Sequence, residues 1–97
     1  EILEVPELDG IFIGPMDLST NMGHMGDADH AEVREVIATV EHKVLDAGKV
    51  LSTISGSWER AEELYEKGYQ MVTLMADGIS LGRLAAATMA QFQEVYR

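Results

Sequence analysis

The chain has 97 residues, of which 46% are hydrophobic but only 6% are aromatic, so a core must be built mainly from aliphatic side chains. With 17 acidic and 7 basic side chains, it carries a formal charge of −10. This balance argues against nucleic acid or an anionic membrane as a partner, because both are recognised through Lys and Arg. The absence of cysteine excludes disulfides and thiolate metal sites.

No apolar run approaches the roughly 20 residues that a membrane helix needs, and no secretory signal is visible. We therefore expect a cytoplasmic protein with no membrane partner. The chain begins with Glu1 and not with Met, so this expectation covers only the residues from Glu1 onward.

The first part of the chain predicts one short strand. Residues 1–8 are typical of the frayed end of an element that starts earlier. Residues 10–14 form an apolar run between glycines, too short for a helix, which predicts a strand buried on both faces. Residues 15–22 suit a helical turn, and the composition of residues 23–27 indicates a loop.

A long helix is predicted after this loop. Asp29 is its expected N-cap, with Glu32 three residues later as in a capping box. Gly48 is expected to end the helix, because glycine tolerates the left-handed backbone found there. The apolar residues recur at spacings typical of one helix face: Val33, Val36, Ile37, Val40 and Val44.

The rest of the chain repeats the strand–helix pattern twice. Residues 50–55 and 71–75 predict strands, and Ser57 is the expected N-cap of the helix between them, which Gly68 ends. That helix has a short apolar stripe: Ala61, Leu64 and Tyr65. After the Asp77-Gly78 dipeptide, a last helix should run to the C-terminus, with one apolar side: Leu81, Leu84, Ala85, Thr88, Met89 and Phe92.

Alternating strands and helices imply an α/β fold of parallel strands joined by crossover helices. Two architectures fit this pattern equally well. The chain can be a complete small doubly wound domain, or it can be the last three units of an eight-unit barrel of about 250 residues.

A motif that suits metal chemistry follows the first predicted strand, at residues 14–19 (GPMDLS). In a parallel barrel, chemistry takes place at the carboxyl ends of the strands, where the Asp17 carboxylate can bind Mg²⁺ or Mn²⁺. The amides of Met16 and Asp17, opening a helical turn, suit a substrate carboxylate, and Gly14 permits close approach. Taken by itself, Asp17 also fits a plain helix N-cap.

The surrounding residues resemble the HpcH/HpaI aldolase family. Residues 8–19 (LDGIFIGPMDLS) are similar to its DGVFIGPADLS signature. Residues 22–26 (MGHMG) and 30–33 (HAEV) are similar to the continuation of that signature. Weaker matches follow at residues 47–49, 68–74 and 81–86, so the resemblance covers nearly the whole chain.

This resemblance implies that residues 1–97 are the C-terminal three strand–helix units of one (β/α)8 TIM barrel of the phosphoenolpyruvate/pyruvate type. Asp17 would be one of two carboxylate ligands of Mg²⁺, Mn²⁺ or Co²⁺. The N–H groups of Met16 and Asp17, beside Gly14, would hold the pyruvate carboxylate. The reaction would be reversible aldol cleavage of a 4-hydroxy-2-oxo acid, such as a 2-keto-3-deoxy sugar acid, to pyruvate and an aldehyde.

The resemblance also implies what lies outside the chain. The family's other metal ligand, a Glu, its catalytic His and its enolate-steadying Arg lie upstream of residue 1. We therefore expect no catalytic residue besides the metal ligand here, and no activity from this chain alone. The family implies a homo-oligomer with the last helix at a subunit interface. Met16 replaces the common Ala or Ser, and the polar residues 52–56 leave the aldehyde preference open.

Other polar residues point to no further site. We expect His24 to be a loop residue that contacts a neighbour, His30 to belong to a helix N-terminus and His42 to be solvated. The spacing of the three histidines is not that of metal ligands. Asp77-Gly78 is interpreted as a turn. The serines and threonine of residues 52–55 have no recognisable His and Asp partners for a nucleophilic triad.

Two other functions are compatible with these residues. A lyase of citramalyl- or malyl-CoA type would share the barrel and the metal carboxylate, although residues 23–26 favour the aldolase branch. A non-catalytic α/β binding module would be complete at 97 residues, although no Gly-rich phosphate loop follows a predicted strand.

Overall fold

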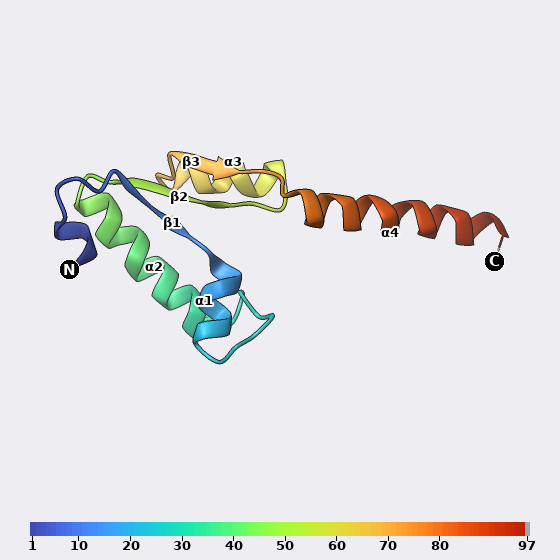
Figure 1. The fold of residues 1–97 in the computed structure, drawn as a ribbon, viewed down its shortest axis with the longest axis horizontal. Helices are drawn as coiled ribbons and strands as arrows, with labels where there is room; N and C mark the ends of the chain where they lie inside the picture. The colour runs from blue at the N-terminus through green and yellow to red at the C-terminus, as the bar shows by residue number, and fades with distance from the viewer. Residues whose placement is uncertain (97) are drawn as a thin grey trace.

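The computed structural model describes residues 1–96 and contains one three-stranded parallel sheet in the order β1–β2–β3 (Figure 1). A short 3-10 helix, η1, precedes the sheet at Ile2–Glu4. The strands are β1 (Gly10–Ile13), β2 (Val50–Ile54) and β3 (Met71–Thr73). The helices are α1 (Pro15–Asn21), α2 (Ala31–Asp46), α3 (Trp58–Glu66) and α4 (Asp77–Tyr96). The predicted order of strands and helices is confirmed; Arg97, which the last predicted helix included, lies outside the described residues.

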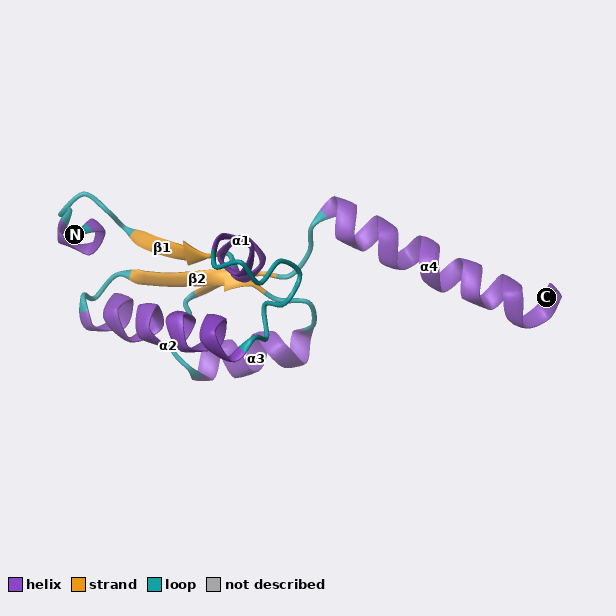
Figure 2. Cartoon of the chain, turned by 90° about the horizontal axis from the view of Figure 1, so that it is seen from below, coloured by secondary structure: helices purple, strands orange, loops and turns teal. Residues whose placement is uncertain are grey.

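The helices α2 and α3 cover the same face of the sheet (Figure 2). Ile13 and Leu51 lie on this face, because Ile11 pairs with Leu51 and side chains alternate along a strand. They form the core with one side chain from each covering helix and one from the loop before β3: Val44, Leu64 and Tyr69. The core is therefore one-sided, as expected for a sheet whose helices all pack on one layer.

Within residues 1–96, no helix or strand covers the other face of the sheet. Phe12, Ser52 and Met71 are register neighbours across the three strands and share this face. The side chains of Phe12 and Met71 are 51% and 54% exposed. The expectation that the first strand is buried on both faces is wrong for this reason: its apolar residues were correctly identified, but helices shield only one side.

Two predicted helix starts differ from the structure. The N-cap of α2 is His30 and not Asp29: the imidazole Nδ1 of His30 accepts a hydrogen bond from the N–H of Glu32 at 3.2 Å, which moves the start by one residue. The last helix begins at Asp77, so Asp77-Gly78 is its first turn and not a separate turn. The predicted Ser57 cap is confirmed, since its Oγ accepts from the N–H of Arg60 at 3.2 Å.

Glycines end the two covering helices as predicted. Gly48 and Gly68 have φ of +68° and +107°, conformations that other residues rarely adopt. Each turn leads directly into a strand, so it fixes where the covering helix leaves off and the sheet begins.

The last helix leaves the body of the protein. None of its residues is buried, and it extends the molecule to 58 Å along its longest axis (Figure 1). The apolar side predicted from the sequence is therefore exposed, with Leu81 and Leu84 at 69% and 66%. No helix among the described residues is long and apolar enough to span a membrane.

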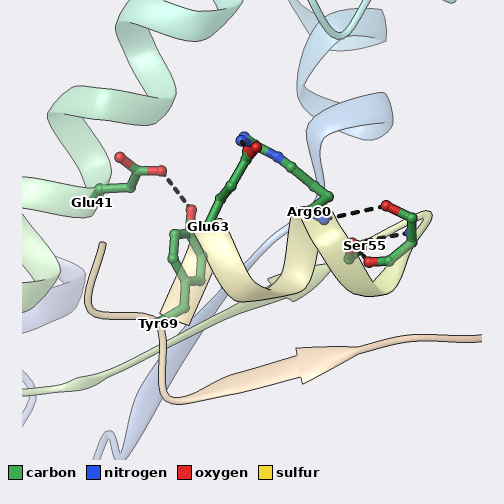
Figure 3. Close-up of polar contacts among 6 residues, drawn as sticks. Glu41, Ser55, Arg60, Glu63 and Tyr69 are labelled. Atoms are coloured by element: carbon green, nitrogen blue, oxygen red, sulfur yellow. Dashed lines mark hydrogen bonds and ion pairs between the residues drawn. The ribbon is translucent and has the colours of Figure 1, made fainter. Parts of the chain in front are cut away.

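A buried polar contact ties α2 to the segment that enters β3. The Tyr69 hydroxyl donates to the Glu41 carboxylate at 2.7 Å, and the tyrosine is only 4% exposed (Figure 3). Burial, helped by this hydrogen bond and by the charge of Glu41, raises the pKa of Tyr69 above its ordinary value. The contact thus joins two consecutive helix–strand units through residues 28 positions apart.

In the full-length protein, we expect Tyr69→Phe to lower the free energy of unfolding in urea by about 1–2 kcal/mol, because one buried hydrogen bond is lost. Tyr65→Phe, at a position 44% exposed, should change it little. Because folding raises the pKa of Tyr69, its contribution is complete below pH about 10 and is lost above it. The difference between wild type and Tyr69→Phe should therefore shrink at higher pH; a constant difference would contradict this account.

Candidate active site

The carboxyl ends of the three parallel strands lie at one edge of the sheet, where β1 runs straight into α1 (Figure 2). Gly14 is the N-cap of α1 and Pro15 its first residue, a position that suits proline because the N–H there has no helical partner. A single residue therefore separates the strand from the helix. The motif found in the sequence therefore consists of this one residue and the first five residues of α1, and it does not lie in a loop.

Asp17 lies at the third position of α1 and its side chain is exposed at this edge. Its carboxylate folds back over Gly14: a Cβ added to Gly14 would lie 3.3 Å from Asp17 Oδ2. The plain N-cap interpretation of Asp17 is wrong, since Gly14 occupies the N-cap position and no side chain caps the helix start. The carboxylate is thus available at the strand end.

Two backbone donors lie beside this carboxylate. The first helical hydrogen bond of α1 runs from the N–H of Leu18 to the carbonyl of Gly14 at 2.9 Å. The N–H groups of Met16 and Asp17 precede this bond and so have no partner within the helix. The hydroxyls of Ser19 and Thr20 donate to the Met16 carbonyl at 2.7 and 3.0 Å, which fixes the turn. Gly14, Met16 and Asp17 therefore lie together at the N-cap and first turn of α1.

The polar side chains at the end of β2 donate hydrogen bonds to backbone carbonyls. Thr53 Oγ1 donates to the carbonyl of Ile13 at 2.7 Å and Ser52 Oγ to that of Ile11 at 2.9 Å. Ser55 Oγ donates to the carbonyl of Ser57 at 2.6 Å (Figure 3). All three hydroxyls are almost completely buried. They hold the end of β1 and the start of α3, and the structure gives none of them the His and Asp partners of a nucleophilic triad.

A cluster that the sequence spacing did not predict lies in the loop between α1 and α2. His24 Nε2 and Glu32 Oε2 are 2.9 Å apart, and the rings of His24 and His30 stack with centroids 3.6 Å apart. Gly23 and Gly26, both with φ of +82°, fold the loop back so that the histidines meet. These two glycines were the only sequence signal for the contact. The expectation that His24 contacts a neighbour is confirmed.

The same cluster offers three ligand atoms within 4.8 Å of one another, from His24, His30 and Glu32. The two rings are nearly parallel, at 12°. Lone pairs of imidazole nitrogens lie in the ring planes, so parallel stacked rings cannot both point at one ion. The cluster in this conformation is therefore an anchor for the loop. The hydrogen bond and charge of His24 lower the pKa of Glu32.

Comparison with known proteins agrees with this geometry. Residues 1–83 match the model of the HpcH/HpaI aldolase/citrate lyase family. The chain belongs to this family. It is 37% identical over 92 residues to a 4-hydroxy-2-oxo-heptane-1,7-dioate aldolase of Klebsiella pneumoniae, covering 95% of this chain. It is 33% identical over 93 residues to a hydroxypyruvate/pyruvate aldolase of Roseovarius nubinhibens, covering 96% of this chain.

Solved structures of the family have the same arrangement. An HpcH/HpaI family protein from Burkholderia cenocepacia superposes with a TM-score of 0.79 at 33% identity, over 99% of this chain and 36% of its own. An HpcH/HpaI aldolase from Desulfitobacterium hafniense gives 0.85 at 26%, over 97% of this chain and 37% of its own. The chain covers 35% of the K. pneumoniae relative and 36% of the R. nubinhibens relative.

We expect the Glu32 carboxyl to titrate below its ordinary pKa of 4.5 in a carbon NMR titration of the full-length protein. Because folding lowers this pKa, the stabilisation it reflects is present above pH 4.5 and is lost as the pH falls. His24→Gln should return the midpoint towards the ordinary value, whereas His42→Gln, which alters a separate contact with Asp46, should not. Equal effects of the two variants would contradict the loop anchor.

Proposed function

We propose that this chain supplies the last three strand–helix units of a (β/α)8 barrel, and that the whole protein is a divalent-metal-dependent aldolase. It would cleave a 4-hydroxy-2-oxo acid reversibly to pyruvate and an aldehyde. The observation that carries the proposal is the exposed Asp17 carboxylate beside the unpaired N–H groups of Met16 and Asp17, at the carboxyl end of β1.

The one-sided sheet supports the barrel. Strands in sequential order with both crossover helices on one face are the arrangement of a barrel wall, whereas a doubly wound domain covers both faces. The uncovered face, with Phe12 and Met71, would be the barrel interior. Three units of eight also agree with a chain that spans about 35% of its relatives. The complete binding module is disfavoured for the same reasons.

The residues at the site fit a hard divalent cation. A carboxylate oxygen is the type of ligand that Mg²⁺ and Mn²⁺ prefer, and Asp17 presents one at a rigid position. A metal bound there, Mg²⁺, Mn²⁺ or Co²⁺, would act as a Lewis acid on the 2-oxo acid and stabilise the enolate. Asp17 alone does not complete a metal site. Since the second carboxylate, the His and the Arg would come from earlier units, this chain alone should be inactive.

The chain's own part in binding substrate is the first turn of α1. The N–H groups of Met16 and Asp17 would donate to the substrate carboxylate at the positive end of the helix. Gly14 carries no side chain that could block this approach. The names of the relatives, a 4-hydroxy-2-oxo-heptane-1,7-dioate aldolase and a hydroxypyruvate/pyruvate aldolase, support a 2-oxo acid as the substrate class.

The exposed apolar side of α4 supports a homo-oligomer in which this helix packs on a neighbouring subunit. A second candidate reaction, cleavage of a CoA thioester, is favoured only by the family description, which includes citrate lyases. It would use the same strand end.

The first test is exchange of the pyruvate methyl hydrogens for deuterium, followed by NMR with the full-length protein and added Mn²⁺ or Mg²⁺. We expect metal-dependent exchange in the wild type and at least a 100-fold loss in Asp17→Asn. Without this carboxylate the metal would be held poorly, and the enolate would lose the positive charge that stabilises it. Asp27→Asn, in the exposed loop after α1, is the matched control. Metal-dependent exchange that survives in Asp17→Asn would show that the metal is held elsewhere, and cleavage of malyl-CoA without pyruvate exchange would favour the lyase.

Gly14→Ala tests the geometry more finely. The backbone at Gly14, with φ of −101° and ψ of 94°, is open to alanine, so the effect should come from the new Cβ alone. That Cβ would press on Asp17 Oδ2 at 3.3 Å. We expect the Mn²⁺ concentration for half-maximal exchange to rise about tenfold, with unchanged urea unfolding. Gly82→Ala, where a Cβ meets nothing within 4 Å, should leave metal activation unchanged.

A further inference from the structure

A hollow lies at the same edge of the sheet, beyond the carboxyl ends of β2 and β3. Its volume is about 190 Å³. Ile54, Leu74 and Ile79 give it apolar walls, and three polar side chains complete it: Ser55, Ser80 and Arg83. Small-molecule sites usually measure about 300–1,000 Å³, so this one would hold part of a ligand and not a whole one.

Arg83 is the only charged residue among the described residues that line the hollow. Its Nη1 donates to the carbonyl of Gly56 at 2.9 Å, which fixes the guanidinium against the loop after β2. Gly56 makes this possible, because a Cβ there would lie 3.2 Å from Arg83 Nη2. A guanidinium has five N–H donors, so most stay available after this bond.

The charge of Arg83 is not neutralised by a neighbouring side chain. None of the ion pairs among the described residues includes Arg83, whereas Arg60 pairs with Glu63 (Figure 3). Arg83 shares this lack of a carboxylate partner with other cations of the chain, but it is the one that lines the hollow and is oriented there by its bond to Gly56. It leaves a positive, partly apolar hollow that suits an anionic group carried on a short carbon chain.

The hollow lies within reach of the Asp17 site. Neighbouring strands are about 5 Å apart, so the ends of β2 and β3 are about 5 and 10 Å from the end of β1. The hollow and Asp17 therefore lie at the same end of one sheet, at the ends of neighbouring strands. The solved relatives superpose over 99% and 97% of this chain, so the direction of α4, which carries Arg83, is common to them.

We propose that Arg83 and this hollow bind the anionic far end of the substrate, so that the preferred aldehyde carries a carboxylate or a phosphate. The inference rests on the proposed aldolase function and deepens it. Ile79 and Ser80, in the first turn of α4, line the hollow beside Arg83. Arg83 would determine which aldehydes are preferred, because it would bind the far end of the substrate and take no part in the reaction.

The test compares aldehydes in the full-length enzyme. Aldol addition of pyruvate is measured with succinic semialdehyde, glyceraldehyde 3-phosphate and the neutral propionaldehyde. We expect Arg83→Gln to raise KM for an anionic aldehyde at least tenfold, Arg83→Lys to restore part of it, and KM for propionaldehyde to stay unchanged. The anionic aldehyde that loses more identifies the group. Arg60→Gln, outside the hollow, is the control and should change none of the three.

An equal loss for all three aldehydes would show that Arg83 only supports the fold and would overturn the proposal, as would no loss for the anionic ones. A direct measurement needs no turnover: the Arg83 side-chain N–H signal in NMR should shift on titration with butyrate or inorganic phosphate. No shift with either overturns the proposal. Pyruvate exchange in the wild-type protein separates the two ideas. Its absence would defeat the aldolase function, while the NMR titration still tests the anion site.

Discussion

The hydrogen bond from Thr53 to the carbonyl of Ile13 lies at the point on which the site depends. It fastens the last residue of β1 to β2, one residue before Gly14 and the start of α1. Parallel pairing already brings the strand ends to one edge, and this buried hydroxyl holds that edge in register. The position of Asp17 therefore follows from the pairing of β1 with β2 and from the single residue, Gly14, that connects β1 to α1.

The sequence predicted the order of elements well, because the signals were local. Apolar spacing predicted α2, and glycines correctly marked where α2 and α3 end. The motif at residues 14–19 also lies at the end of β1 as expected, since a short strand followed by Gly-Pro leaves little freedom in where Asp17 lies. These features depend on neighbours in the chain, which a single sequence contains.

What the sequence did not predict depends on contacts between distant residues. Phe12 is exposed because α2 and α3 both pack on the opposite face of the sheet. The sequence of β1 contains no pattern that indicates which face these helices cover. The identity of the residues that His24 contacts, His30 and Glu32, depends on a loop turned back at two left-handed glycines. The hollow beside Arg83 depends on a hydrogen bond from Arg83 to the carbonyl of Gly56, 27 positions away. Every residue has a backbone carbonyl, so the sequence does not indicate which one accepts this bond.

The exposed apolar side of α4 has a thermodynamic consequence. A helix that leaves its own body gains little from intrachain packing, so whatever covers it contributes to the stability of the folded state. In the homo-oligomer proposed above, subunit association would then add to stability by mass action. The melting temperature of such a protein should depend on its concentration, and dilution itself would act as a mild denaturant.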